Sequence, residues 1–288
     1  MTSDGMTGES DMGRMTWPLG LTLFDDGPVG VVVVNYNTRD LTAQLIYSLY
    51  RRVQRPRFHL VIVDNGSADG SPALLQELAS DGMCDALLNR EQRYHGPGLN
   101  QGIDYLAQRQ RTVAEQERLR AVWVLDSDCI IMRDDVLSSA MEVLRQTQAG
   151  LVGQWYYDAW RHRDLLALHS LLLDPSLVWQ EGITPFQEDG NPSEALQRSA
   201  ARAGVVAAEF PFTRNGAIIH PGRGTLRALV HREDRSNRYF PWATDHNNPH
   251  FTGEAAARLH YRRFLDEFRS NVGDVTAASL IRACGKRR

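Results

Sequence analysis

Two aspartates one residue apart, Asp126 and Asp128, directly follow an apolar run in the segment VWVLDSDCII (122–131). Carboxylates at this spacing can converge on one divalent cation as the chain leaves a strand. Mg²⁺ and Mn²⁺ take oxygen ligands and are commonly shared with substrate phosphates. The pair therefore predicts a metal site that neutralises a diphosphate leaving group. The alternative is that one aspartate caps the following turn and the other is solvated.

Polar residues also follow two other apolar runs, VGVVVVN (29–35) and FHLVIVDN (58–65). Parallel strands bring their carboxyl ends to one edge of a sheet, where ligands of open α/β folds bind. The sequence Asp-Asn-Gly after the second run is also strong turn chemistry, so a turn and a ligand contact are both consistent with it. The residues concerned are Asn35, Tyr36 and Asn37 at the end of the first run, and Asp64 near the end of the second.

The elements that must position these residues alternate regularly up to residue 147. Continuous β-branched runs predict strands buried on both faces, and apolar residues at helical spacing lie between them. This alternation predicts βαβ units and a mostly parallel sheet with helices on both faces. The predicted strands cover 29–35, 58–65, 85–90 and 121–128, and the predicted helices cover 41–53, 71–80, 100–119 and 135–147.

The chain after residue 150 has a less regular pattern. It predicts a further strand at 151–160, a loop at 180–195 and a strong helix at 254–271. Segment 231–253 is rich in polar and turn-forming residues, which suggests a lid that orders when a ligand binds.

Composition narrows the class of protein. The formal net charge is −3, from 32 basic and 35 acidic residues, and no long basic run occurs, which argues against nucleic-acid binding. The three cysteines are widely spaced without a C-x-x-C pair, which favours a reducing compartment. No run approaches the roughly 20 apolar residues of a membrane span, and the amino terminus lacks the pattern of a secretory signal. We expect a cytoplasmic protein, with a peripheral membrane contact left open.

Four segments, in this order, closely resemble the inverting family-2 glycosyltransferases with a GT-A fold: VVVVNYNTRDLTAQLIYSL, HLVIVDNGSADGSPALL, HGPGLNQGIDYL and WVLDSDCII. The resemblance covers residues 29 to about 155 and fades beyond. It implies an α/β fold of GT-A type, with a mixed carboxyl-terminal acceptor region. It divides one continuous domain into a flexible lead (1–28), a nucleotide-sugar-binding half (29–155) and an acceptor-binding, helical half (156–288).

The resemblance also assigns roles to residues. Asp128 would ligate Mn²⁺ or Mg²⁺ directly, and Asp126 would contact the ribose or hold the metal through water. Asp64 would face the base, where a carboxylate accepts the imide N–H of uracil. The glycine-rich segment 95–102 would let the backbone approach the donor closely. The implied nucleotide-sugar contacts are Asn35, Tyr36, Asn37, Asp64, Gly96, Gly98, Asn100, Asp126, Asn215 and Gly216.

An inverting transfer needs a base that takes the proton from the acceptor hydroxyl. The resemblance places this base downstream of NGAIIHPG (215–222), where Asp234 is the preferred candidate, with Glu233 and Asp245 as alternatives. A solvated charge cluster is an equally good interpretation of REDR. His250 is the candidate that would complete the metal shell, against the alternative of a loop histidine without a ligand.

The expected function is therefore metal-dependent, inverting transfer of a sugar from a nucleotide-diphosphate donor, with UDP or dTDP favoured. The acceptor hydroxyl would belong to a saccharide, a glycolipid precursor, a peptide or a small natural product. One alternative is a nucleotidyltransferase with a similar sheet, but NYNTRDLTAQL lacks the glycine- and arginine-rich loop it would need. Another is a protein that binds nucleotide-sugars without turnover. The sequence does not indicate the sugar or the oligomeric state.

Overall fold

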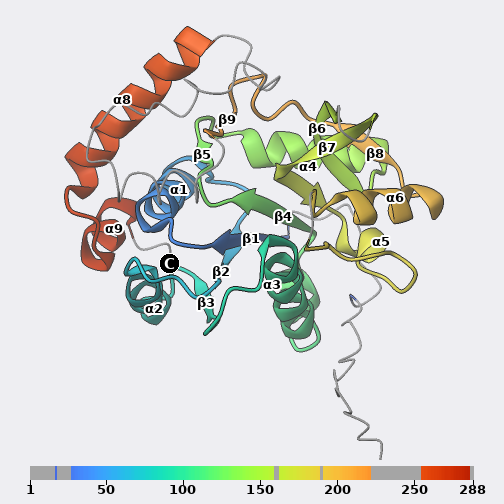
Figure 1. The fold of residues 1–288 in the computed structure, drawn as a ribbon, viewed down its shortest axis with the longest axis horizontal. Helices are drawn as coiled ribbons and strands as arrows, with labels where there is room; N and C mark the ends of the chain where they lie inside the picture. The colour runs from blue at the N-terminus through green and yellow to red at the C-terminus, as the bar shows by residue number, and fades with distance from the viewer. Residues whose placement is uncertain (1–16, 18–26, 159–161, 189–190, 222–253, 286–288) are drawn as a thin grey trace, which may run out of the picture.

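A seven-stranded sheet in the order β3-β2-β1-β4-β7-β6-β8 forms the centre of the protein (Figure 1). The computed structural model describes residues 17, 27–158, 162–188, 191–221 and 254–285. The strands of the large sheet are β1 (Val29–Asn35), β2 (Phe58–Asp64), β3 (Asp85–Leu88), β4 (Ala121–Asp126), β6 (Leu151–Asp158), β7 (Arg163–Leu173) and β8 (Ala207–Glu209). A separate two-stranded sheet pairs β5 (Ile130–Ile131) with β9 (Ile218–Ile219).

The first four strands of the large sheet are parallel, as the sequence predicted. Their register places Asn35 beside Asp64 and Val34 beside Asp126, so the three strand ends lie at one edge. Beyond β4 the sheet is mixed, because β7 runs antiparallel to both β4 and β6, and β8 is parallel to β6. The mostly parallel α/β fold is confirmed, although β7 was not among the predicted strands.

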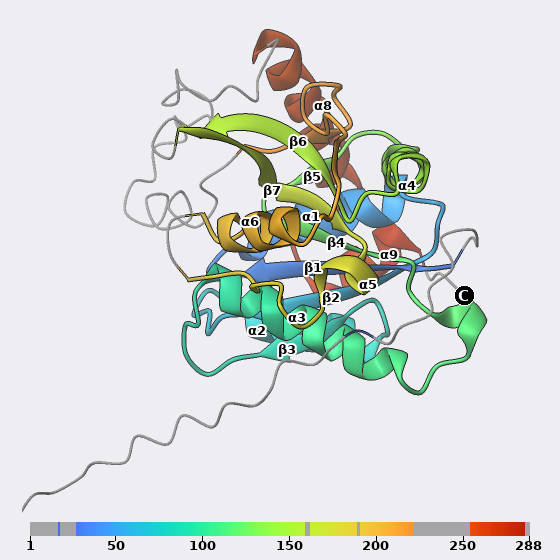
Figure 2. The same cartoon turned by 90° about the vertical axis from the view of Figure 1, so that its right-hand side faces the viewer.

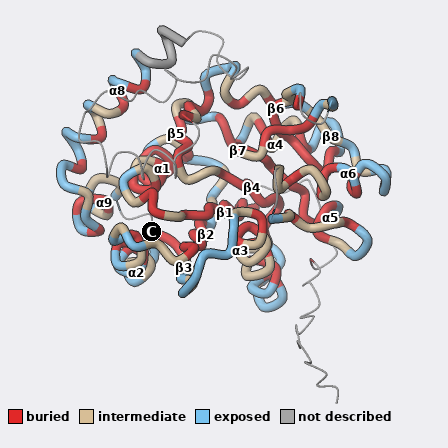
Figure 3. Tube along the Cα trace, viewed as in Figure 1, coloured by how far each residue is buried: buried red, intermediate tan, exposed pale blue. Residues whose placement is uncertain are grey.

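Apolar side chains cover both faces of the sheet, which explains the uninterrupted β-branched runs. Val31 and Val33 of β1 join one core cluster, and Val32 and Val34 join the other. Because successive side chains of a strand point to opposite faces, a strand covered on both sides must be apolar at every position. Figure 3 shows the resulting buried centre.

Helices from different parts of the chain contribute to the two clusters. Figure 1 shows α1 and α3 on opposite sides of β1, and Figure 2 shows the β6–β7 ribbon curving beyond the central strands. One cluster receives residues from α1 (Arg39–Arg52), α2 (Ser71–Ser80), α4 (Val136–Thr147), α8 (Glu254–Val272) and α9 (Ala277–Cys284). The other receives residues from α3 (His95–Gln110), α5 (Pro175–Val178) and α6 (Glu194–Arg202).

Helix α3 begins and ends earlier than the predicted helix at 100–119. Gly96, Pro97 and Gly98, which the sequence placed before the helix, occupy its first turn. Proline is tolerated there because the first amide groups of a helix have no intrahelical acceptor. The helix ends at Gln110, whose side-chain oxygen accepts a hydrogen bond from the Leu119 amide at 2.7 Å and holds the returning chain.

Described residues near both ends of the chain pack into the core, including those of α8 and α9. Trp17 is buried, with its amide donating to the Trp179 carbonyl oxygen at 3.3 Å. The helix predicted at 254–271 is present as α8. Within the described residues, no helix is both long and apolar enough to cross a bilayer.

Candidate active site

The two aspartates of the D-x-D segment lie where β4 ends. Asp126 is the last residue of β4, and its carbonyl oxygen accepts a hydrogen bond from the Cys129 amide at 3.1 Å. The turn places Asp128 in a buried position, 5 % exposed. Asp126 Oδ1 and Asp128 Oδ2 are buried without a hydrogen-bond partner among the described residues. Such oxygens are costly unless something binds them, so they point to a ligand.

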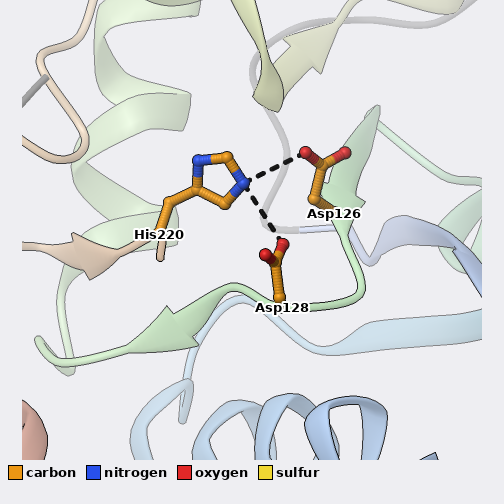
Figure 4. Close-up of side chains that lie close together, drawn as sticks. All are labelled: Asp126, Asp128 and His220. Carbon is orange, nitrogen blue, oxygen red and sulfur yellow. Dashed lines mark ion pairs between the residues drawn. The ribbon is translucent and has the colours of Figure 1, made fainter. Parts of the chain in front are cut away.

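A histidine from a distant part of the chain completes this cluster. β5 and β9 pair antiparallel with Ile130 opposite Ile219, so His220 arrives beside the D-x-D turn. Its Nε2 atom lies 3.2 Å from Asp126 Oδ2 and 3.2 Å from Asp128 Oδ1 (Figure 4). One ligand atom from each of the three residues lies within 4.8 Å of the others, a spacing that one metal ion could bridge.

The charged groups in this cluster shift one another's pKa values. Burial acts to lower the pKa of His220, but the carboxylates of Asp128 and Asp126 outweigh burial and raise the pKa to about 10. Burial would raise the pKa of the Asp126 carboxyl, yet the contact with His220 and the charges of His95 and His169 hold it well below its usual range. A proton on His220 and a divalent cation would therefore compete for the same two carboxylates.

Two further histidines surround the cluster. His95 Nε2 lies 3.6 Å from Asp126 Oδ1, on the carboxylate oxygen that His220 does not contact. The His169 ring, from β7, stacks on His220 with ring centroids 4.4 Å apart and an interplanar angle of 12°. Three imidazoles from α3, β7 and the residue after β9 thus meet at the end of β4.

A second group of polar residues lies at the ends of β1 and β2. The buried Asn35 amide donates to Asp64 Oδ1 at 2.6 Å and to Ser67 Oγ at 3.1 Å. Its Oδ1 atom accepts hydrogen bonds from Thr38 and Thr42, each at 2.7 Å. Asp64 is completely buried, and its second oxygen accepts from the Ser67 amide at 2.9 Å. These contacts fasten the two strand ends to each other.

Residues 36 and 37 continue this connection. Asn37 adopts a left-handed conformation with φ 54°, its amide donates to Ser67 Oγ at 2.8 Å, and its Oδ1 atom accepts from the Ala68 amide at 2.8 Å. Tyr36 is half-buried at the same edge. Hydrogen bonds therefore connect the loops after β1 and β2 to each other, beside the acidic cluster of Asp126, Asp128 and His220.

Comparison with known proteins identifies the fold and the family. Residues 30–193 match the family model described as "Glycosyl transferase family 2". The chain belongs to glycosyl transferase family 2. The α/β architecture with its mostly parallel sheet is the GT-A fold, and the nucleotidyltransferase alternative is set aside. No curated protein matches the sequence.

Solved structures of glycosyltransferases resemble this family-2 chain at low identity. The mannosyltransferase PcManGT from Pyrobaculum calidifontis, in complex with GDP-Man and Mn²⁺, is 18% identical, with a TM-score of 0.50 over 92% of this chain and 81% of that chain. S. aureus TarS is 14% identical, with a TM-score of 0.48 over 84% and 72% of the two chains. Glucosyl-3-phosphoglycerate synthase from Mycobacterium tuberculosis is 16% identical, with a TM-score of 0.47 over 72% and 80%.

The glycine-rich segment of this glycosyltransferase has a packing role in the structure. A Cβ atom on Gly96 would lie 1.9 Å from the Gln187 carbonyl oxygen, so only glycine fits there. Asn100 donates to the Phe186 carbonyl oxygen at 2.9 Å and accepts from the Phe186 amide at 3.1 Å. Gly98 packs against Val34 in the same way, with Cβ contacts near 3.0 Å. The donor contacts implied for these three residues stay predictions.

The remaining predicted residues fall in two groups. Asn215 and Gly216 form an exposed turn before β9, where Asn215 Oδ1 accepts a hydrogen bond from the Ala217 amide at 3.0 Å. The structure gives them this turn role and leaves a donor contact as a prediction. The base candidates Asp234, Glu233 and Asp245, the metal candidate His250 and the suggested lid at 231–253 lie outside the described residues.

His220 is the site residue that the sequence interpretation passed over. It directly follows the apolar residues Ala217, Ile218 and Ile219, as Asp126 follows the apolar run of β4. The same rule that singled out Asp126, a polar residue at the end of a buried strand, would have selected His220. β9 is only two residues long, so its strand signal was too short to recognise.

Proposed function

We propose that this family-2 glycosyltransferase moves a sugar from a nucleotide-diphosphate donor to an acceptor hydroxyl in a metal-dependent, inverting reaction. The observation that carries the proposal is the convergence of Asp126, Asp128 and His220 at the carboxyl edge of a mostly parallel sheet. Substrates of open α/β folds bind at this edge. A divalent cation bound there would neutralise the charge that develops on the diphosphate leaving group.

The donor atoms fit a divalent cation. They comprise two carboxylates and one imidazole, and the buried oxygen Asp128 Oδ2 has no hydrogen-bond partner in the described part of the chain. Mg²⁺ and Mn²⁺ both suit carboxylates, but Mg²⁺ keeps to oxygen and water, whereas Mn²⁺, a transition-metal ion, accepts an imidazole nitrogen beside carboxylates more readily. We favour Mn²⁺ over Mg²⁺ for this reason, and the Mn²⁺ in the Pyrobaculum complex is consistent with the choice.

The nucleotide would lie against the loops after β1 and β2, which hydrogen bonds connect to each other. We favour UDP or dTDP because the Asp64 carboxylate would accept the imide N–H of the base. Asp64 already accepts hydrogen bonds from Asn35 and Ser67, so the base would occupy remaining lone-pair sites of a carboxylate that these donors hold in place. Tyr36 and Asn37 would border the same nucleotide site.

The protein groups would divide the work as follows. Asp128 and His220 would hold the cation, and Asp126 would either join them or hold it through water. The half of the chain from 156 to 288 supplies the acceptor site. A base there, Asp234 in preference to Glu233 or Asp245, removes the proton from the acceptor hydroxyl as that oxygen attacks the anomeric carbon. The sugar–phosphate bond breaks on the opposite face, which inverts the anomeric configuration.

Calorimetric titration of UDP, dTDP and GDP, each with and without Mn²⁺, tests the donor site. Wild type is compared with Asp128→Ala and with the matched control Asp134→Ala, which removes an exposed carboxylate six positions along the chain that pairs only with Arg52 at 3.7 Å among the ion pairs described. We expect Mn²⁺-dependent binding of one nucleotide that is lost in Asp128→Ala and kept in Asp134→Ala. Binding indifferent to Mn²⁺, or no nucleotide binding at all, would contradict the proposal.

The stereochemistry is tested on the product. Incubation with α-linked sugar donors of the nucleotide identified by calorimetry, Mn²⁺ and a panel of saccharide, glycolipid, peptide and small-molecule acceptors should yield a β-linked product. The one-bond coupling between C1 and H1 in the NMR spectrum distinguishes the anomers. A product of retained configuration would refute inversion, and donor binding without any turnover would favour the non-catalytic alternative.

A further inference from the structure

His95 lies next to Asp126 Oδ1, a carboxylate oxygen to which no other described group hydrogen-bonds. Its Nε2 atom lies 3.6 Å from Asp126 Oδ1. Both atoms are buried, and neither has a hydrogen-bond partner among the described residues. Two buried polar atoms that face each other just beyond hydrogen-bond distance are costly unless a small movement joins them. Hydrogen bonds at catalytic sites are often long in the free protein and shorten when the site is loaded.

The residue before His95 has an unusual backbone conformation that is held by a side-chain hydrogen bond. Tyr94 has φ 56° and ψ 171°, a region that residues other than glycine rarely adopt. Its carbonyl oxygen accepts a hydrogen bond from the Asn65 side chain at 2.7 Å, and Asn65 Oδ1 accepts one from Asn89 at 3.1 Å. Backbone strain maintained by such contacts is typical of functional sites.

We propose that His95 is the positioning residue for Asp126: its Nε2–H group donates to Asp126 Oδ1 and thereby orients the opposite oxygen, Oδ2, toward the metal beside His220. The inference rests on the proposed metal site. Ligating carboxylates are commonly oriented by a hydrogen-bonding partner of this kind, and loss of that partner typically weakens metal binding 10- to 100-fold. The donor role needs only the Nε2–H tautomer, so it does not depend on the charge of the ring.

The role of Nε2 can be separated from the mere presence of a ring by three substitutions. Glutamine places its amide nitrogen near the position of Nε2, asparagine places its own near Nδ1, and phenylalanine fills the space without a donor. We expect His95→Phe and His95→Asn to bind Mn²⁺ about 10- to 100-fold more weakly than wild type, and His95→Gln to remain within a few-fold of it. The affinity for Mn²⁺ alone is measured by electron paramagnetic resonance, without nucleotide.

The matched control is His59→Phe. His59 is an exposed histidine near the start of β2, at the opposite edge of the sheet from the strand ends, so its loss should leave the Mn²⁺ affinity unchanged. Thermal unfolding of each variant in EDTA shows whether the fold is retained. A purely structural role for His95 would lower the melting temperature of the asparagine and glutamine variants without separating their Mn²⁺ affinities.

The outcomes separate this inference from the proposed function. If wild type binds no Mn²⁺, the metal-dependent function fails and the role of His95 fails with it. If wild type binds Mn²⁺ and all three His95 variants bind it equally well, the inference is overturned and the metal site stands. If the variants keep their Mn²⁺ affinity and lose only UDP or GDP affinity, His95 contacts the donor, and the positioning role is likewise overturned.

Discussion

Two clusters of buried polar groups at the same edge of the sheet differ in how their atoms are partnered. Around Asn35, side-chain donors and acceptors bond to one another, with four contacts between 2.6 and 3.1 Å. Around Asp126, by contrast, Asp126 Oδ1, Asp128 Oδ2 and His95 Nε2 have no hydrogen-bond partner within the described residues. Buried polar groups normally have hydrogen-bond partners. We therefore interpret the first cluster, which comprises Asn35, Thr38, Thr42, Asp64 and Ser67, as a structural clamp, and the second as a site that a ligand completes.

The two clusters touch at one point. Thr38 Oγ1 lies 3.0 Å from Ser127 Oγ, the residue between the two aspartates, while it also bonds to Asn35. The clamp therefore holds the turn that presents the metal ligands. If the contrast is correct, substitutions at Asn35, Thr38 and Thr42 should cost mainly stability, and substitutions in the acidic cluster should cost mainly metal binding and activity.

The largest expected effect is that of Asp128→Asn, which keeps the shape of the side chain and removes its charge. A bound cation contributes several kcal/mol of transition-state stabilisation, so transfer activity with Mn²⁺ should fall by about a thousandfold. Initial rates of sugar transfer measure this loss, with Asp134→Asn as the control that should retain wild-type rates. Mn²⁺-dependent activity at the wild-type level in Asp128→Asn would remove the acidic cluster from the reaction.

The opposite pattern is expected for Asn35→Leu. The substitution leaves the Asp64 carboxylate and two threonine hydroxyls without their buried partner, and each such group costs about 1–3 kcal/mol. Urea unfolding of the metal-stripped protein should show a loss of about 3 kcal/mol. The control is Asn271→Leu, at an exposed position near the end of α8. A stable Asn35→Leu protein that fails only in nucleotide binding would reverse the assignment of this cluster.

The acidic cluster should also show a dependence on pH that the clamp does not. The pKa of His220 is raised to about 10, and the ring must lose its proton to ligate a metal. Mn²⁺ affinity should therefore rise with pH, by up to about tenfold per unit between pH 6.5 and 8.5. In the metal-stripped protein the sign is opposite: the ion pair's contribution to stability is complete below about pH 6.5 and is lost as the pH rises through 10.

Calorimetry at three pH values, in two buffers of different ionisation enthalpy, measures both the affinity and the proton released. His220→Gln should bind Mn²⁺ weakly and without this slope. A wild-type affinity that does not change with pH would mean that His220 does not compete with the metal.

The smallest effect tests the point where the clusters touch. Thr38→Val and Thr42→Val each remove one hydrogen bond to Asn35, so each should lower the free energy of unfolding by about 1 kcal/mol. Only Thr38→Val also removes the contact with Ser127, so only this variant should weaken Mn²⁺ binding, by a few-fold. Equal Mn²⁺ affinities in the two variants would mean that the clamp does not position the turn.

The sequence was sufficient for much of the nucleotide-side half of the fold. The runs at 29–35, 58–65 and 121–128 each contain at least four consecutive apolar residues, as a strand covered on both faces requires. Strands form there at Val29–Asn35, Phe58–Asp64 and Ala121–Asp126. Asp126 and Asp128 were located because the residues that end a buried parallel strand meet the ligand edge. Both signals come from residues that are neighbours in the sequence.

The positions of the other site residues depend on contacts between segments that are far apart in the sequence. His220 reaches Asp128 only because β5 pairs with β9, and two-residue strands leave almost no signal of their own. Gly96 and Asn100 look like ligand-binding residues in a glycine-rich segment, yet they contact Gln187 and Phe186. No local sequence pattern predicts these two contacts.

The sequence by itself indicated the family, through the resemblance of four segments to family-2 glycosyltransferases. It also determined the parallel strands and the carboxylate pair, because hydrophobic periodicity and strand-end chemistry are properties of neighbouring residues. Only the tertiary structure decided which histidines face those carboxylates and which polar groups satisfy one another. The physical reason is that hydrogen bonds and metal ligation depend on distances of a few ångströms between atoms that the chain separates widely, as Asp126 is separated from His95 and His220.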